Sequence, residues 1–164
     1  MSVFVSAAEL NERIQAGQKQ TVIAALWEPK DGKAWSKFQS EHIPTALYCD
    51  PSVQLAGMPG RSAGRNPLPS IDVVRKAAAG WGVEDGRPVY IYDGGNGLFA
   101  ARAWWILRWA GVQDVHILDG GFPAWGWAVV VGALLVVIAG VGLLLGRRRN
   151  ADEDEQVDLE EWRG

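Results

Sequence analysis

YIYDGGNGLFAAR, residues 90–102, joins a short apolar run to a glycine-rich turn and then to an apolar helical pattern. A buried strand that runs through such a turn into a helix is a common place for bound anions and reactive groups in α/β proteins. This stretch contains no Cys, Ser, Thr, His or Lys, and its charged side chains are Asp93 and Arg102. We therefore ask which atom at this junction could carry chemistry.

Strand-like and helix-like segments alternate on both sides of the junction. Ser6 and Glu9 form a capping box for a helix that ends near Gly17, and Ser70 caps another that runs to Gly80. Further helices are expected at 33–40 and 98–110, and strands at 21–27, 46–49, 88–93 and 114–119. Residues 50–69 hold four prolines and three glycines and predict a long loop. The alternation predicts an α/β fold with a parallel sheet and helices on both faces.

The composition changes abruptly at Gly126. Residues 126–146 contain no charged and no strongly polar side chain, and as a helix they would span about 31 Å, which matches the hydrocarbon thickness of a bilayer. Trp125 and Trp127 precede the run and three arginines follow it, as interfacial anchors do. The competing interpretation is a buried core helix. We predict one C-terminal transmembrane helix, in which the Gly142 and Gly146 spacing weakly favours helix pairing.

These features divide the chain into a domain at 1–125, a membrane helix at 126–146 and a tail at 147–164. The tail is basic at first and then acidic, which predicts disorder. The net charge is −3, with twelve basic and twelve acidic residues in 1–146, so no basic surface points to nucleic acid. The N-terminus is too polar for a signal peptide, and Cys49 is the only cysteine, so we expect a cytoplasmic domain on a single-pass membrane protein.

The glycine turn also permits a dinucleotide-binding interpretation. Gly95, Gly97 and Ala100 fit the G-x-G-x-x-A spacing, and Asp119 ends the next strand where a ribose-binding acid belongs. Asp93 would lie close to the pyrophosphate, however, and too few residues follow Asp119 to complete that fold. We regard this alternative as the weaker one.

Five stretches together indicate a family: EHIPTAL (41–47), GRNPLP (64–69), PVYIYD (88–93) with its glycine turn, AARAWWILRWAG (100–111) and VHILDGGFPAW (115–125). In this order they resemble the rhodanese domain, and most of all the N-terminal, non-catalytic half of tandem-domain thiosulfate or 3-mercaptopyruvate sulfurtransferases. The resemblance covers about three quarters of the chain and implies the rhodanese-like parallel sheet.

The resemblance also implies what belongs at the glycine turn. Active members of the family carry a cysteine at the position of Asp93, and the loop Gly94–Gly97 aims backbone N–H groups at its sulfur. A carboxylate at this position can cap the helix, but it cannot accept and transfer a sulfane sulfur. The family's Asp-x-Arg at the end of the second strand is replaced by Ala24 and Leu26. We therefore predict no catalytic residue in this chain.

The remaining candidates have structural explanations beside functional ones. Cys49 is expected to be a buried strand cysteine, and His42 and His116 are expected to be structural, with no metal site. Arg102 should be paired with Asp93 or Asp119, or else bind an anion together with the loop Asp93, Gly94, Gly95, Asn96 and Gly97. Arg61 and Arg65 are candidates for contact with an anionic substrate. Trp104, Trp105 and Trp109 are expected to pack in the core.

The expected function is that of a membrane-anchored rhodanese-like module, binding or regulatory, which requires no cofactor. Its expected partners are the lipid bilayer and a catalytic rhodanese domain or another protein. The alternative is the non-catalytic half of a thiosulfate or 3-mercaptopyruvate sulfurtransferase, which would need a second, catalytic domain.

Overall fold

The computed structural model describes residues 2–161, with side chains placed through Val141 and at Leu143. The chain divides into two compact units, Met1–Ala128 and Val129–Gly164, and each is described by itself. In chain order the elements are β1 (Phe4–Val5), α1 (Ala7–Gln15), β2 (Thr21–Ala25), α2 (Lys33–Ser40), β3 (Ala46–Cys49), α3 (Pro51–Gln54), α4 (Ile71–Gly80), β4 (Val89–Tyr92), α5 (Leu98–Trp109), β5 (Val115–Leu118) and α6 (Gly121–Glu161).

The predicted α/β architecture is confirmed. The first unit is built on a five-stranded sheet in the order β1-β5-β4-β2-β3, and all of its strand pairs are parallel. Ser6 and Ser70 cap α1 and α4 through hydrogen bonds from the backbone N–H groups of Glu9 and Val73, as the capping signals predict. The strand order reverses between β2 and β4, and at such a switch point the carboxyl ends of parallel strands leave a crevice.

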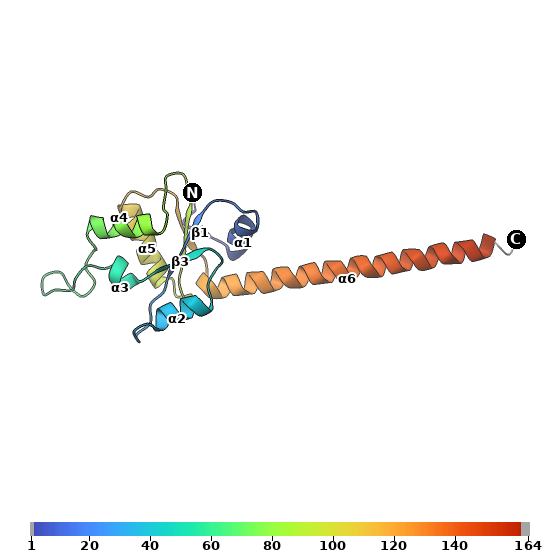
Figure 1. Cartoon of the computed structure of the whole chain (residues 1–164), viewed down its shortest axis with the longest axis horizontal. Coiled ribbons are helices and arrows are strands. Elements are labelled where there is room, and N and C mark those ends of the chain that lie inside the picture. The colour runs from blue at the N-terminus through green and yellow to red at the C-terminus, as the bar shows by residue number, and fades with distance from the viewer. Residues whose placement is uncertain (1, 162–164) are drawn as a thin grey trace. The chain divides into compact units, whose positions relative to one another are not determined.

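The strands bury both of their faces, so each sheet face has its own core. Ile91 of β4 packs with α4 and α5, whereas its neighbour Tyr92 packs with α1, α2 and the start of α6. Figure 1 shows α1 on one side of the strands and α4 and α5 on the other. Near-continuous apolar strands such as β2 are what a doubly covered parallel sheet requires.

Three local features differ from the predictions. The two-residue strand β1 was not foreseen, because it is too short to show a pattern. The predicted loop at 50–69 begins with the short helix α3, which Asp50 caps by accepting a hydrogen bond from Ser52 N at 2.9 Å. Trp105 and Trp109 are 47% and 46% exposed and stack on each other instead of entering the core. The core side of α5 is filled by smaller residues and by Trp104, which is partly buried.

The second unit consists of the continuation of α6. The segment Gly121–Val141 is long and apolar enough to cross a membrane, with a mean hydropathy of 2.3. Trp127 is exposed, but Trp125 is buried in the core of the first unit, so the prediction that both are interfacial anchors is wrong for Trp125. The helix continues to Glu161, where the sequence predicted disorder, and the tail contains the strong helix formers Ala, Glu and Leu. Residues 162–164 lie outside the described part of the chain.

Candidate functional site

Asp93 lies at the carboxyl end of the middle strand of the sheet. It follows directly after β4, the central strand on one side of the switch point between β2 and β4. The side chain is only 1% exposed, which makes it one of two buried polar residues in the described part of the chain. A buried carboxylate must be compensated by hydrogen bonds or charge, so its partners define the site.

Four backbone N–H groups surround the Asp93 carboxylate. Oδ1 accepts hydrogen bonds from Gly95 N at 2.9 Å and Gly97 N at 3.1 Å, and Oδ2 accepts from Phe99 N at 3.1 Å and Ala100 N at 3.2 Å. We call these four groups the N–H cradle. Two come from the turn and two from the first turn of α5, where helical N–H groups have no partner within the helix. As predicted, Asp93 caps the helix from inside the turn.

The turn can adopt this shape because it contains glycine at the strained positions. Gly95 and Gly97 have φ values of +113° and +74°, which side-chain-bearing residues rarely adopt. Between them, the Asn96 side chain accepts a hydrogen bond from Leu98 N at 3.1 Å, which satisfies another N–H at the start of α5. The described contacts therefore satisfy the N–H groups of Gly95 and of residues 97–100 without any ligand.

A second glycine pair closes the site from behind. Phe122 N donates a hydrogen bond to the Asp93 carbonyl at 3.0 Å, and a Cβ on Gly121 would lie 2.8 Å from that same oxygen. Gly95 in turn packs against Pro123. The LDGGFP segment thus presses the beginning of α6 onto the turn. Sequence reasoning treated this segment as a family signature only, although its two adjacent glycines were the signal for a close backbone approach.

Arg102 does not pair with Asp93 or Asp119, so that prediction is wrong. Its guanidinium donates hydrogen bonds to three backbone carbonyls, those of Leu55 at 2.8 Å and of Asn66 and Pro67 at 3.2 Å each. The four N–H groups already satisfy Asp93, which leaves Arg102 free to reach across to the long loop. Arg102 is therefore structural, and it holds the two ends of residues 55–67 together.

Arg61 and Arg65 lie on the exposed tip of that loop. The tip is a small antiparallel bridge between Gly60 and Gly64, which exchange two backbone hydrogen bonds. Within residues 2–161 neither guanidinium forms a hydrogen bond or ion pair with another described residue. Both guanidinium groups could therefore meet an anion supplied by a partner, as the sequence suggested. Neither forms a hydrogen bond or ion pair with Asp93.

Cys49 and the two histidines have structural surroundings. Burial raises the pKa of the Cys49 thiol well above its ordinary range, and the neighbouring Asp50 carboxylate raises it further. His42 Nδ1 lies 2.9 Å from Phe38 O, and His116 lies 2.8 Å from both Ser2 O and Asp114 Oδ1. No group of residues suited to hold a metal occurs among those that the structure describes.

In the crevice beside the turn, apolar residues stand at the positions where the family resemblance implies polar ones. Ala24 and Leu26 are buried in the apolar core at the end of β2. A cavity of about 180 Å³ adjoins Gly94, and its charged lining residues are Lys37 and Glu41. The dinucleotide alternative also loses support here, because Asp93 already occupies the N–H groups that a pyrophosphate would need.

Comparisons with known proteins agree with this fold. A model of the rhodanese-like domain family matches residues 6–127. The Mycobacterium tuberculosis protein named "Putative thiosulfate sulfurtransferase SseB" is 35% identical over 123 residues, which cover 75% of this chain and 43% of that protein. The 3-mercaptopyruvate sulfurtransferase of Escherichia coli is 32% identical over 128 residues, with 74% and 43% covered.

Solved structures show the same relation. The SseA 3-mercaptopyruvate sulfotransferase from Escherichia coli superimposes with a TM-score of 0.65 and 30% identity, covering 77% of this chain and 49% of that one. The 3-mercaptopyruvate sulfurtransferase from Leishmania major shares the fold, with a TM-score of 0.68 and 23% identity over 77% of this chain and 34% of that one. The chain spans about half the length, or less, of the relatives it matches.

Proposed function

This chain belongs to the rhodanese-like domain family, and we propose that it acts as a membrane-anchored, non-catalytic binding module of that family. The observation that carries the proposal is the Asp93 carboxylate inside the N–H cradle. The family resemblance implies a sulfur nucleophile at this position. Here the Asp93 carboxyl group takes its place, and it cannot form the sulfur–sulfur bond that sulfane transfer requires.

Cys49, the one thiol of the chain, cannot take over this role from its present position. It is fully buried at the end of β3, and its raised pKa keeps it as the neutral thiol, whereas the thiolate is the nucleophile. Of the site residues that the sequence suggested, Arg61 and Arg65 on the long loop then remain available to a partner. This loop suits contact with an anionic group on a partner protein.

The test is cyanide-dependent thiocyanate formation from thiosulfate by the full chain in lipid nanodiscs. We expect no turnover above the background of empty nanodiscs, in the wild type and in Cys49→Ala alike. Turnover in the wild type that disappears in Cys49→Ala would show that the chain is catalytic after all.

Membrane anchoring is supported by the side chains of the apolar helix. Leu134, Val136 and Ile138 are more than half exposed, which water would disfavour and a bilayer would not. We place residues 1–125 in the cytoplasm, because a domain of this length precedes the helix and would otherwise have to cross first. Protease protection of sealed spheroplasts, with a tag at each end, tests this orientation. External protease that removes the N-terminal tag while the C-terminal tag survives would reverse it.

A second candidate function follows from the length of the relatives. Because the chain spans about half of them, it could be the non-catalytic half of a sulfurtransferase whose catalytic domain lies elsewhere. A suitable probe is a rhodanese domain with an active-site cysteine, assayed for thiocyanate formation with and without this chain. An increased rate that is lost in the double variant Arg61→Ala, Arg65→Ala would favour this function over that of an independent binding module.

A further inference from the structure

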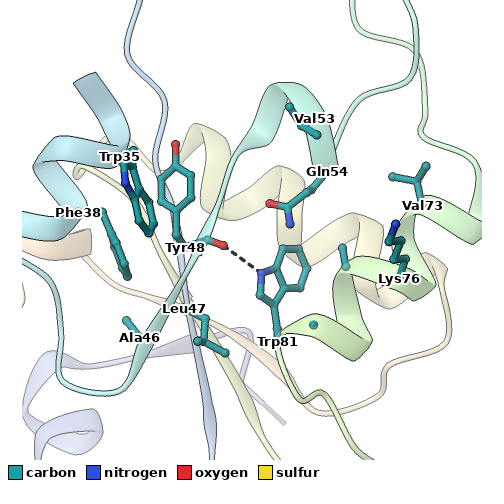
Figure 2. A pocket seen from close by; sticks show the side chains of 12 residues that line it. Trp35, Phe38, Ala46, Leu47, Tyr48, Val53, Gln54, Val73, Lys76 and Trp81 are labelled. Carbon is teal, nitrogen blue, oxygen red and sulfur yellow. Dashed lines mark hydrogen bonds between the residues drawn. The ribbon is translucent and has the colours of Figure 1, made fainter. Parts of the chain in front are cut away.

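A cavity lies at the free edge of β3, two strands away from β4 and Asp93. It has a volume of about 700 Å³ and is formed by α2, β3, α3 and α4. We call it the β3-edge groove. This volume lies within the range typical of small-molecule sites, which are mostly apolar with a few polar groups. Figure 2 shows the side chains that line it.

The walls of the groove are aromatic. Trp35 and Tyr48 meet edge to face, with ring centroids 5.1 Å apart and planes inclined by 71°, whereas Trp81 is only 5% exposed and lines the groove on the other side of β3 (Figure 2). Further apolar side chains at the groove are unusually exposed: Trp35, Leu47, Val53 and Val73 are 46%, 40%, 65% and 39% exposed. Contiguous exposed apolar patches often mark binding sites on soluble proteins.

The polar side-chain groups in the groove that lack a partner are hydrogen-bond donors. The Trp81 indole N–H is already used, since it donates to Tyr48 O at 3.1 Å, and Gln54 Oε1 accepts from Asp50 N at 2.8 Å. Lys76 Nζ and Gln54 Nε2, in contrast, have no acceptor among the described residues. The groove therefore offers two free donors, one of them positively charged.

The two nearby carboxylates, those of Asp50 and Asp72, do not pair with these donors. Asp50 lies next to Tyr48 in the sequence, but it does not line the groove, and its Oδ1 is held by Ser52 N and Ser52 Oγ. On α4, Asp72 pairs with Arg75 and not with Lys76. A ligand that brings its own acceptor would thus find Lys76 unpaired.

An added β-strand fits this edge poorly. β3 is the last strand of the sheet, and the Trp81 indole already takes the Tyr48 carbonyl, which an incoming strand would need. A flat ring that packs on Trp35 and Tyr48 makes no such demand on the backbone. Stacking on aromatic walls favours planar ligands over flexible chains.

We propose that the β3-edge groove is a binding site for a planar aromatic carboxylate, whose ring packs against Trp35 and Tyr48 across the edge of β3 and whose carboxylate accepts hydrogen bonds from Lys76 and Gln54. The site does not involve Asp93 or its N–H cradle, so it is independent of the function proposed above. It gives the module a second recognition surface, for a small anionic ligand.

The test follows the indole ¹⁵N–¹H signals of the ¹⁵N-tryptophan-labelled full chain in nanodiscs, with 2-naphthoate as the probe. We expect saturable shifts of the Trp35 and Trp81 signals and none at Trp105 and Trp109, which lie on α5 outside the groove. Lys76→Gln should weaken 2-naphthoate binding about fivefold, the size expected of one exposed charge pair. Arg75→Gln, which removes a neighbouring cation outside the groove, should leave the affinity unchanged.

Two further ligands separate the contributions of ring and charge. The neutral 2-naphthamide should bind more weakly than 2-naphthoate and equally to the wild type and Lys76→Gln, and octanoate should bind more weakly than either aromatic ligand. Equal affinity for 2-naphthoate and octanoate would overturn the aromatic specificity, and equal affinity for 2-naphthoate and 2-naphthamide would overturn the anionic one. Absence of saturable shifts at Trp35 and Trp81 would overturn the site itself. Shifts that depend on the number of chains per nanodisc would assign the groove to a second copy instead.

Discussion

The N–H cradle follows the central strand β4, whereas the β3-edge groove lies along the edge strand of the same sheet, and the two differ in whether their polar groups already have partners. In the cradle, four N–H groups converge on a carboxylate that is part of the chain and 1% exposed. In the groove, Lys76 and Gln54 keep free donors near the exposed ring of Trp35. The first arrangement stabilises the fold, and the second is suited to bind something else. The cradle occupies the place where the family resemblance implies chemistry, but its polar groups already have partners within the chain. Position in a fold alone therefore does not identify a binding site.

Arg102 connects these two regions. It lies on α5, whose first turn supplies half of the cradle, and it holds the Leu55 carbonyl directly after α3, which carries Val53 and Gln54 of the groove. A change in one region could therefore reach the other through Arg102. The following four predictions test how far the contrast between the regions holds.

The largest effect is expected from Asp93→Ala. Four N–H groups, of which one is buried and three are partly buried in these contacts, would lose their acceptors at once. Each buried unsatisfied group costs about 1–3 kcal/mol and water restores part of the loss at the partly buried ones, so we expect a loss of about 4 kcal/mol. The measurement is denaturant unfolding of the full chain in nanodiscs, followed by tryptophan fluorescence. Formate should restore part of the stability by entering the vacated cradle.

Asp119→Ala is the matched control, because Asp119 is exposed and its carboxylate makes no hydrogen bond with the described residues. It should change the free energy of unfolding by no more than about 0.5 kcal/mol. If Asp93→Ala were as stable as this control, the cradle would not be a stabilising element and its contrast with the groove would disappear.

Arg102→Met should cost about 2 kcal/mol, because three carbonyls lose a charged donor while the aliphatic part of the side chain is kept. The loop that carries Arg61 and Arg65 should also become more sensitive to trypsin. Arg75→Met, in an exposed pair with Asp72, should have almost no effect on either quantity. Unchanged stability and proteolysis in Arg102→Met would mean that Arg102 does not couple the two regions.

Asp93→Cys, made in a Cys49→Ala background, examines what the cradle does to a thiol. The N–H groups and the start of α5 favour a negative charge, so the pKa of the new thiol should fall at least one unit below the free value of about 8.5. The pH dependence of iodoacetamide alkylation reports this pKa, with Ser62→Cys on the exposed loop as the reference. An apparent pKa equal to that of the reference would show that the N–H groups no longer converge when the carboxylate is absent.

The smallest effect concerns Cys49, at the end of the strand that borders the groove. Burial raises its pKa in the folded chain, so above about pH 8.5 the unfolded chain loses this proton while the folded chain keeps it. Stability that is present below pH 8.5 should therefore fall with rising pH, by up to about 1.4 kcal/mol per unit. Tyr92, with its pKa raised by burial to about 12, adds to the loss above pH 10.

Unfolding measured between pH 8.5 and pH 10 checks this prediction. Cys49→Ala lowers stability at every pH through the lost side chain, but its stability should decline less steeply over this interval than that of the wild type. Parallel declines in the two proteins would contradict a buried, neutral thiol at residue 49.

The order and type of most elements could be predicted from local sequence. Ser6 and Ser70 predict the starts of α1 and α4, and the glycine turn after residues 88–93 predicts the start of α5. These signals work because capping and strand burial depend on residues close together in the chain. β1 could not be predicted in this way because two residues show no pattern, and α3 could not because it begins a stretch rich in proline and glycine whose composition indicates a loop.

The sequence by itself determined that no thiol occupies the turn and that an apolar helix follows the domain, because both are matters of which residues are present. Only the tertiary structure decided where Arg102 binds, since its three carbonyl partners are between 35 and 47 residues away along the chain. It also decided that Trp125 is buried while Trp105 and Trp109 are exposed, although all are apolar. The β3-edge groove likewise exists only once α2, β3, α3 and α4 are assembled. Residue identity limits the possible chemistry, but the partners that satisfy or expose each polar group are chosen by the fold.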